Sequence, residues 1–190
     1  MKKESIIISI IGAPSSGKST LATDVHTELK KSSENSIYIP ECATDFIAEY
    51  GVPSSPMDQM IIFYKQLNRE RMFIGSKDYI LCDSSSLLNY FYFRSLFDNP
   101  LSNKDIASIN HIQKEILKSI NQWSYIFYVP PIKQKSVVDG IRFHNEDEIS
   151  QIDSNIKCYL SIENIKYYDL SSIDISKRKE HILDIIKNKK

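Results

Sequence analysis

Cysteine is scarce in this sequence, and long apolar runs are absent. The 190 residues contain three cysteines, Cys42, Cys82 and Cys158, which lie far apart and form no Cys-x-x-Cys pair. This pattern disfavours a zinc site and a disulfide framework, and it favours a reducing compartment. No apolar run approaches the roughly 18 residues that a membrane span requires. We therefore expect a cytoplasmic protein without a membrane partner.

An excess of charge of either sign is also missing. Lys and Arg together number 24, as do Asp and Glu, so the formal net charge is zero. Such a chain has no overall field to attract nucleic acid, and this partner is disfavoured unless a local basic patch exists. Hydrophobic residues make up 42% of the chain. This content and the chain length indicate one globular domain over residues 1–190.

Short β-branched runs alternate with longer helical patterns along the chain, which is typical of βαβ units. The expected strands are Ser5–Ile11, Ser36–Pro40, Tyr79–Cys82, Tyr125–Val129 and Lys166–Leu170. The expected helices are Ser19–Lys31, a segment capped by Ser55 and reaching about Ile74, Asn103–Gln122, Glu148–Leu160 and Ile175–Lys187. The pattern predicts an α/β fold in which helices cover both faces of a parallel sheet.

A phosphate-binding loop (P-loop) follows the first strand. Residues 12–19 read Gly-Ala-Pro-Ser-Ser-Gly-Lys-Ser, which matches G-x-x-x-x-G-K-S between a strand and a helix. The glycines allow backbone N–H groups to face a bound anion at a helix N-terminus. The nucleotide-binding residues that we predict are Gly12, Ser15, Ser16, Gly17, Lys18, Ser19 and Thr20. Lys18 would contact the β- and γ-phosphates, and the Ser19 hydroxyl would bind Mg²⁺.

Two acidic residues stand where predicted strands end. Glu41 follows the second strand, and Asp83 follows the third. Functional groups of parallel sheets gather beyond the carboxyl ends of the strands, so both carboxylates should flank the phosphate site. We predict that Glu41 is the base or orients the acceptor, and that Asp83 belongs to the Mg²⁺ shell. The sequence leaves open which of the two accepts the proton, and either could be an ordinary loop acid.

Only five basic residues are arginines, so each is a candidate for a specific role. Arg142 lies in Asp139-Gly140-Ile141-Arg142, within a polar stretch near residues 133–148 that we predict to be a kinase lid. There it would stabilise charge on the transferred phosphoryl group. Arg178 stands between two lysines, a context that favours solvated surface over a nucleotide contact. Arg69 and Arg71 could face the acceptor or water, and the aromatic run 90–93 could stack on an acceptor or join the core.

With these motifs in order, the chain resembles a family of P-loop ATPases and kinases. Its best-known members are the nicotinamide riboside kinase domains of bacterial NAD-synthesis proteins. The similarity rests on the phosphate loop and on the segments around Glu41, Asp83 and Arg142. It implies a five-stranded kinase core of strand order 2-3-1-4-5, ATP with Mg²⁺ as the donor, and a ribosyl hydroxyl as the acceptor. Thr44 and Ser85 depart from the family pattern, which often has Arg and an acid at these positions.

The resemblance and the chain length together favour a small-molecule kinase. A guanine-specific GTPase would carry Asn-Lys-x-Asp after a strand, whereas Asn103-Lys104-Asp105 has another spacing and opens a helix. We expect an ATP-dependent phosphotransferase acting on nicotinamide riboside, a nucleoside or a nucleotide, and the chain could act as a homodimer. The alternatives are a nucleotide-binding regulatory ATPase or GTPase switch and a kinase that acts on nucleic acid.

Overall fold

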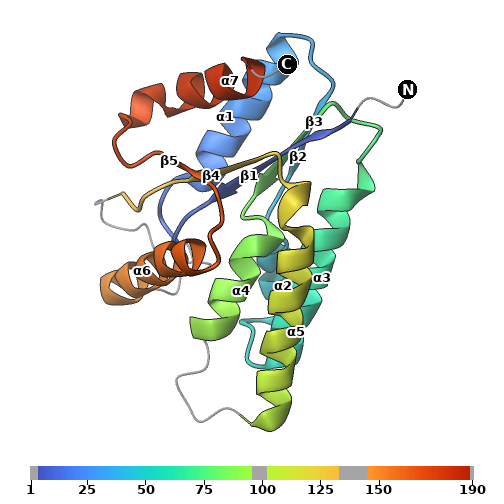
Figure 1. The fold of residues 1–190 in the computed structure, drawn as a ribbon, viewed down its shortest axis with the longest axis vertical. Coiled ribbons are helices and arrows are strands. Elements are labelled where there is room, and N and C mark those ends of the chain that lie inside the picture. The colour runs from blue at the N-terminus through green and yellow to red at the C-terminus, as the bar shows by residue number, and fades with distance from the viewer. Residues whose placement is uncertain (1–3, 96–101, 133–144, 189–190) are drawn as a thin grey trace.

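A five-stranded sheet forms the centre of the computed structural model, which describes residues 4–95, 102–132 and 145–188. The strands are β1 (Ile6–Ile11), β2 (Ser36–Ile39), β3 (Tyr79–Asp83), β4 (Tyr125–Tyr128) and β5 (Tyr168–Asp169). They pair in the order β2-β3-β1-β4-β5, and every pairing is parallel (Figure 1). The predicted strand order 2-3-1-4-5 is confirmed. The ends of β1, β2 and β3 therefore meet at one edge of the sheet.

Helices cover both faces of this sheet. The described segments form α1 (Lys18–Lys31), α2 (Cys42–Tyr50), α3 (Pro56–Met72), α4 (Ser86–Ser95), α5 (Asn103–Ser119), α6 (Glu146–Ile162) and α7 (Arg178–Lys187), with 3-10 turns η1 (Ile120–Gln122) and η2 (Ile175–Lys177). Reciprocal capping boxes begin α3, α5 and α6 at Ser55, Ser102 and Asn145. Each box satisfies backbone N–H groups that have no partner within the helix.

The alternation of side chains along the strands divides the core into two halves. Ile8 and Ile10 of β1 join a cluster with α1 and α7 on one face of the sheet. Ile7 and Ile11 join a cluster with α3, α4, α5 and α6 on the other face. Figure 1 shows α1 and α7 side by side above the sheet, with α2 to α5 below it. Successive strand residues point to opposite faces, so both faces of β1 need isoleucine.

Several elements differ from the sequence-based prediction. The segments Cys42–Tyr50 and Ser86–Ser95, for which we predicted no element, are helices α2 and α4. The last strand, β5, has only two residues, Tyr168–Asp169, in place of the predicted Lys166–Leu170, and it pairs with β4 alone. Residues 145–148 of the predicted lid form the cap and first turn of α6, while residues 133–144, including Arg142, lie outside the described residues. Within the described segments, the helices are too short or too polar to cross a membrane.

Candidate functional site

The loop between β1 and α1 has the backbone shape that the motif predicts. Ser15 and Gly17 adopt left-handed conformations, with φ of 60° and 81°. At Gly12, an added Cβ atom would lie 2.2 Å from the carbonyl oxygen of Val129, so only glycine fits against β4 there. Left-handed residues in such a loop turn successive N–H groups toward one concavity. The loop thus ends at the N-terminus of α1, where a helix attracts anions.

Polar side chains of the loop are positioned for a ligand. Ser16 is 1% exposed, and its hydroxyl has no hydrogen-bond partner within the residues that the structure describes. The Lys18 side chain is buried, and its Nζ donates a hydrogen bond of 2.9 Å to the carbonyl of Ala13. Ser19 and Thr20 are exposed in the first turn of α1. A buried hydroxyl without a partner is costly, which indicates that Ser16 is completed by something bound at the loop.

Asp83, at the end of β3, is almost completely buried and half satisfied. It is 2% exposed, and its Oδ2 accepts a hydrogen bond of 2.9 Å from the Tyr38 hydroxyl. Its Oδ1 has no hydrogen-bond partner in the part of the chain that is described. Burial, followed by the charge of Asp83, raises the pKa of Tyr38, so this phenol stays protonated and donates. One oxygen of Asp83 is therefore fixed by Tyr38, and the other is buried without a hydrogen-bond partner among the described residues.

Glu41 lies near Lys18 and Asp83. It occupies the N-cap position of α2, and its side chain makes no cap hydrogen bond within the described residues. Burial raises the pKa of Glu41; the positive charge of Lys18 opposes this shift, and the negative charge of Asp83 adds to it. Glu41 and Asp83 follow the neighbouring parallel strands β2 and β3, so both acids lie at the carboxyl edge of the sheet, within electrostatic reach of Lys18. A carboxylate whose proton affinity is raised by burial is suited to accept a proton.

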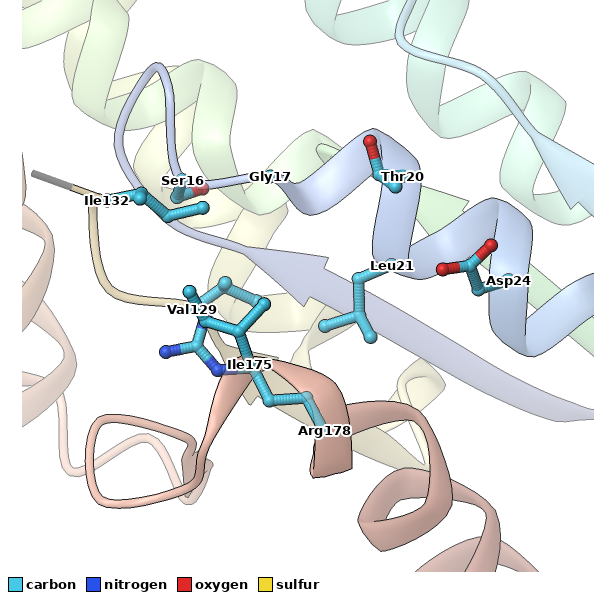
Figure 2. Close-up of a pocket in the computed structure, with 9 residues that line it drawn as sticks. All are labelled: Ser16, Gly17, Thr20, Leu21, Asp24, Val129, Ile132, Ile175 and Arg178. Atoms are coloured by element: carbon cyan, nitrogen blue, oxygen red, sulfur yellow. The ribbon is translucent and has the colours of Figure 1, made fainter. Parts of the chain in front are cut away.

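A cavity of about 170 Å³ lies on the other side of the phosphate loop. Its lining residues are Ser16, Gly17, Thr20, Leu21, Asp24, Val129, Ile132, Ile175 and Arg178. Figure 2 shows the Arg178 side chain beside Ile175, below the loop that carries Ser16 and Gly17. The wall combines the aliphatic Leu21, Val129, Ile132 and Ile175 with the polar Ser16, Thr20, Asp24 and Arg178. This arrangement suits a flat, partly polar ring attached to the phosphates on the loop.

The sequence-based prediction that Arg178 is a solvated surface residue is wrong. Its side chain is 7% exposed, and its Nε donates a hydrogen bond of 3.2 Å to the carbonyl of Ile173. Burial lowers the pKa of Arg178, although Asp174 opposes this shift. The signal that we missed is the spacing of four that places Arg178 on the same helix face as the buried Ile182 and Ile186.

The remaining candidates are engaged elsewhere or lie outside the described residues. Arg69 forms an ion pair of 2.9 Å with Asp45, and Arg71 donates to Ser119 at 2.6 Å, so both arginines have structural partners. Phe91 belongs to the core. The side chains of Tyr90, Tyr92 and Phe93 and all of Arg142 are not described. No three His, Cys, Asp or Glu side chains cluster as a metal site in the described ranges.

A family model described as an AAA domain matches residues 7–178, which is most of the chain. The chain belongs to this AAA-domain family. The comparison of this chain with curated proteins finds no match. Its fold is also found in solved structures of low sequence identity. The match to residues 7–178 includes the phosphate loop, both acids and Arg178, so the whole candidate site lies inside the AAA domain.

Solved structures with this fold include several kinases. NadR protein in complex with NR is 15% identical with a TM-score of 0.72, and the match covers 97% of this chain and 50% of that one. Deoxyadenosine kinase from M. mycoides with bound dCTP is 14% identical with a TM-score of 0.66, covering 96% and 100% of the two chains. Thymidylate kinase from Candida albicans is 17% identical with a TM-score of 0.59, covering 98% and 92%. The chain thus spans half the length of the NadR chain and has the P-loop kinase fold.

Proposed function

We propose that this AAA-domain protein is an ATP-dependent kinase that transfers the γ-phosphate to a hydroxyl of a nucleoside-like small molecule. The observation that carries the proposal is the convergence of Lys18, Glu41 and Asp83 beside the phosphate loop. A nucleotide-binding loop alone serves many proteins, whereas two acids next to the phosphate site provide both a proton acceptor and a metal ligand. The kinases that share this fold act on substrates of the same class, which supports the choice of acceptor.

The donor nucleotide would lie across the loop and the aliphatic cavity. Its phosphates would accept hydrogen bonds from the loop N–H groups and from the Ser16 hydroxyl, which has no partner among the described residues. The Lys18 ammonium would exchange its contact with Ala13 for the β- and γ-phosphates. The base would occupy the cavity against Ile132, with Arg178 along one edge. The aliphatic side chains would contact the faces of the base, and Arg178 would contact its edge.

The residues present also fit a Mg²⁺ ion. Ser19 is exposed at the first turn of α1, and Asp83 presents the unpartnered Oδ1. Oxygen ligands of this kind, together with phosphate oxygens and water, are those that Mg²⁺ prefers, and a dedicated cage of protein side chains is not needed. The ion would neutralise charge on the phosphates. Tyr38 would keep the Asp83 carboxylate in one orientation by donating to its second oxygen.

Glu41 would accept the proton of the attacking hydroxyl. As the acceptor oxygen forms its bond to the γ-phosphorus, the bond from phosphorus to the β,γ-bridging oxygen breaks and ADP leaves with that electron pair. Lys18 would offset the charge that develops on the phosphoryl oxygens, and we propose Arg142 for the same role from the segment 133–144. Catalysis would thus depend mainly on positioning and charge neutralisation.

The test is transfer of phosphate from labelled ATP with Mg²⁺ to a panel of acceptors. The panel contains nicotinamide riboside, the common nucleosides and their monophosphates, and a short DNA, with acceptor-free hydrolysis measured in parallel. A labelled product from a nucleoside or nucleotide supports the proposal. Tight ATP binding with hydrolysis but no labelled acceptor would refute the kinase and favour a regulatory ATPase, and labelled DNA would identify a nucleic-acid kinase.

Two substitutions connect any activity to the site. Lys18→Ala should abolish transfer while the protein stays folded, whereas Lys30→Ala, an exposed lysine on the same helix, should leave transfer unchanged. Asp83→Asn should lower turnover far more than ATP affinity, because the carboxylate acts on the metal and not on the base of the nucleotide. Full activity of Lys18→Ala would show that the reaction takes place elsewhere.

A further inference from the structure

Helix α3 carries a fully buried carboxylate that the proposed reaction does not use. Glu70 is 0% exposed, and both of its oxygens accept hydrogen bonds from distant segments. Oε1 accepts from the backbone N–H of Ser86 at 2.5 Å, and Oε2 accepts from the Ser86 hydroxyl at 2.9 Å. The Gln122 amide donates a further hydrogen bond of 3.0 Å to Oε2. Ser86 is the first residue of α4, so a side chain of α3 caps that helix.

One helical turn earlier, α3 caps a second helix in the same way. Gln66 is 1% exposed, and its Oε1 accepts a hydrogen bond of 2.9 Å from the backbone N–H of Cys42. Cys42 is the first residue of α2. An N-cap side chain usually accepts from the second or third N–H of its helix, but the N-cap residue Glu41 makes no such bond in the part of the chain that the structure describes. Gln66 satisfies the first N–H of α2, and the Glu41 carboxylate takes no part in capping the helix.

The two capped residues follow the two acids of the candidate site. Cys42 comes directly after Glu41, and Ser86 lies three residues after Asp83. Residues 66 and 70 are four apart and therefore lie on one face of α3, so they respond together to any movement of that helix. Glu70 is buried with both oxygens hydrogen-bonded, and Gln66 is buried with its Oε1 bonded to Cys42, so neither side chain has much freedom. Anchoring both caps on one rigid element would fix the separation of the two acids.

We infer that Gln66 and Glu70 are positioning residues, which hold Glu41 and Asp83 at the separation that phosphoryl transfer requires. This inference rests on the proposed function, because it gives both acids a part in the reaction. Neither residue contacts the phosphate loop in the hydrogen bonds described above. Loss of either anchor should therefore weaken the chemical step and leave the donor site intact. An error of position as small as about 1 Å can lower a rate by about 100-fold.

The experiment compares Gln66→Ala, Glu70→Ala and Glu70→Gln with the wild-type protein in the transfer assay. The two alanine variants should lower kcat by about tenfold or more, with KM for ATP within about twofold of wild type. Glu70→Gln should restore most of the rate, because its amide oxygen can still accept from the Ser86 N–H. If Glu70→Ala does not fold, as judged by circular dichroism, then Gln66→Ala carries the test.

The control is Ile116→Ala, which removes a fully buried side chain of α5 from the same core cluster and leaves the hydrogen bonds of both anchors unchanged. It should lower the melting temperature while kcat stays within about twofold of wild type, so that lost stability alone does not explain the anchor variants. Folded alanine variants with wild-type kcat would overturn the inference. A fall in the kcat of Ile116→Ala that matches its loss of melting temperature would also overturn it, because lost stability would then explain the anchor variants. No transfer by the wild-type protein to any acceptor would instead refute the proposed function, and the positioning role with it.

Discussion

The buried carboxylate of Glu70 should make the stability of the protein depend on pH in a direction opposite to that of most acids. Burial raises the pKa of Glu70 to about 7 from an ordinary value of 4.5, although the hydrogen bonds from Ser86 oppose the shift. The folded protein therefore holds a proton that the unfolded chain releases above pH 4.5. This contribution to stability is complete below pH 4.5 and is lost as the pH rises to about 7. At about 1.4 kcal/mol per pKa unit, the loss amounts to about 3 kcal/mol.

The assay is urea unfolding of the wild-type protein and of Glu70→Gln at several pH values between 4.5 and 8. The variant carries a neutral amide at this position, so the other titrating groups cancel in the comparison. The unfolding free energy of the wild type minus that of the variant should fall by about 3 kcal/mol between pH 4.5 and pH 8, and it should level off near pH 8. A difference that does not change with pH, or that rises with it, would refute the reasoning.

Three further substitutions test the geometry of the site. Gly12→Ala should cost about 1–3 kcal/mol of stability and weaken ATP binding, because the new Cβ atom meets the Val129 carbonyl oxygen; chemical denaturation and nucleotide titration would measure both effects. Tyr38→Phe removes the hydrogen bond to the buried Asp83 and should cost about 1.5–3 kcal/mol in denaturant unfolding, with a fall in kcat. Arg178→Ala should weaken binding of a fluorescent ATP analogue by about tenfold, or about 1.4 kcal/mol. Unchanged affinity would show that the base does not bind in this cavity.

The sheet and the phosphate loop could be predicted from the sequence because their signals are local. The isoleucine run of β1 leads directly into the glycine-rich loop, and both have a fixed relation to α1. The proximity of Glu41 and Asp83 could also be predicted, since each stands at the end of a strand and parallel strands end at one edge. The strand order required the family resemblance, because periodicity alone does not specify which strands are neighbours.

The sequence-based prediction failed where a residue is defined by a distant partner. The N-cap residue of helix α2 makes no side-chain cap bond among the described residues, and the first N–H of the helix donates to Gln66, which lies 24 residues beyond Cys42. Glu70 stands in a charged segment between Arg69 and Arg71 and resembles a surface residue, yet its donors are 16 and 52 residues away. Such contacts form only after the helices pack, so no local pattern identifies them.

The division of the core by the sheet has a consequence for how such a protein could change its substrate. The cavity proposed for the donor base is lined by α1, η2 and α7, on one face. The anchors of the two acids come from α3, on the opposite face, and meet the helix starts after β2 and β3. In the proposed kinase, replacing side chains of α2, α3 or α4 should therefore change the preference for the acceptor and leave the donor cavity unchanged. Directed evolution for a new acceptor should select mutations on the face of the sheet covered by α2, α3 and α4. Directed evolution for a new donor should select mutations on the face covered by α1 and α7.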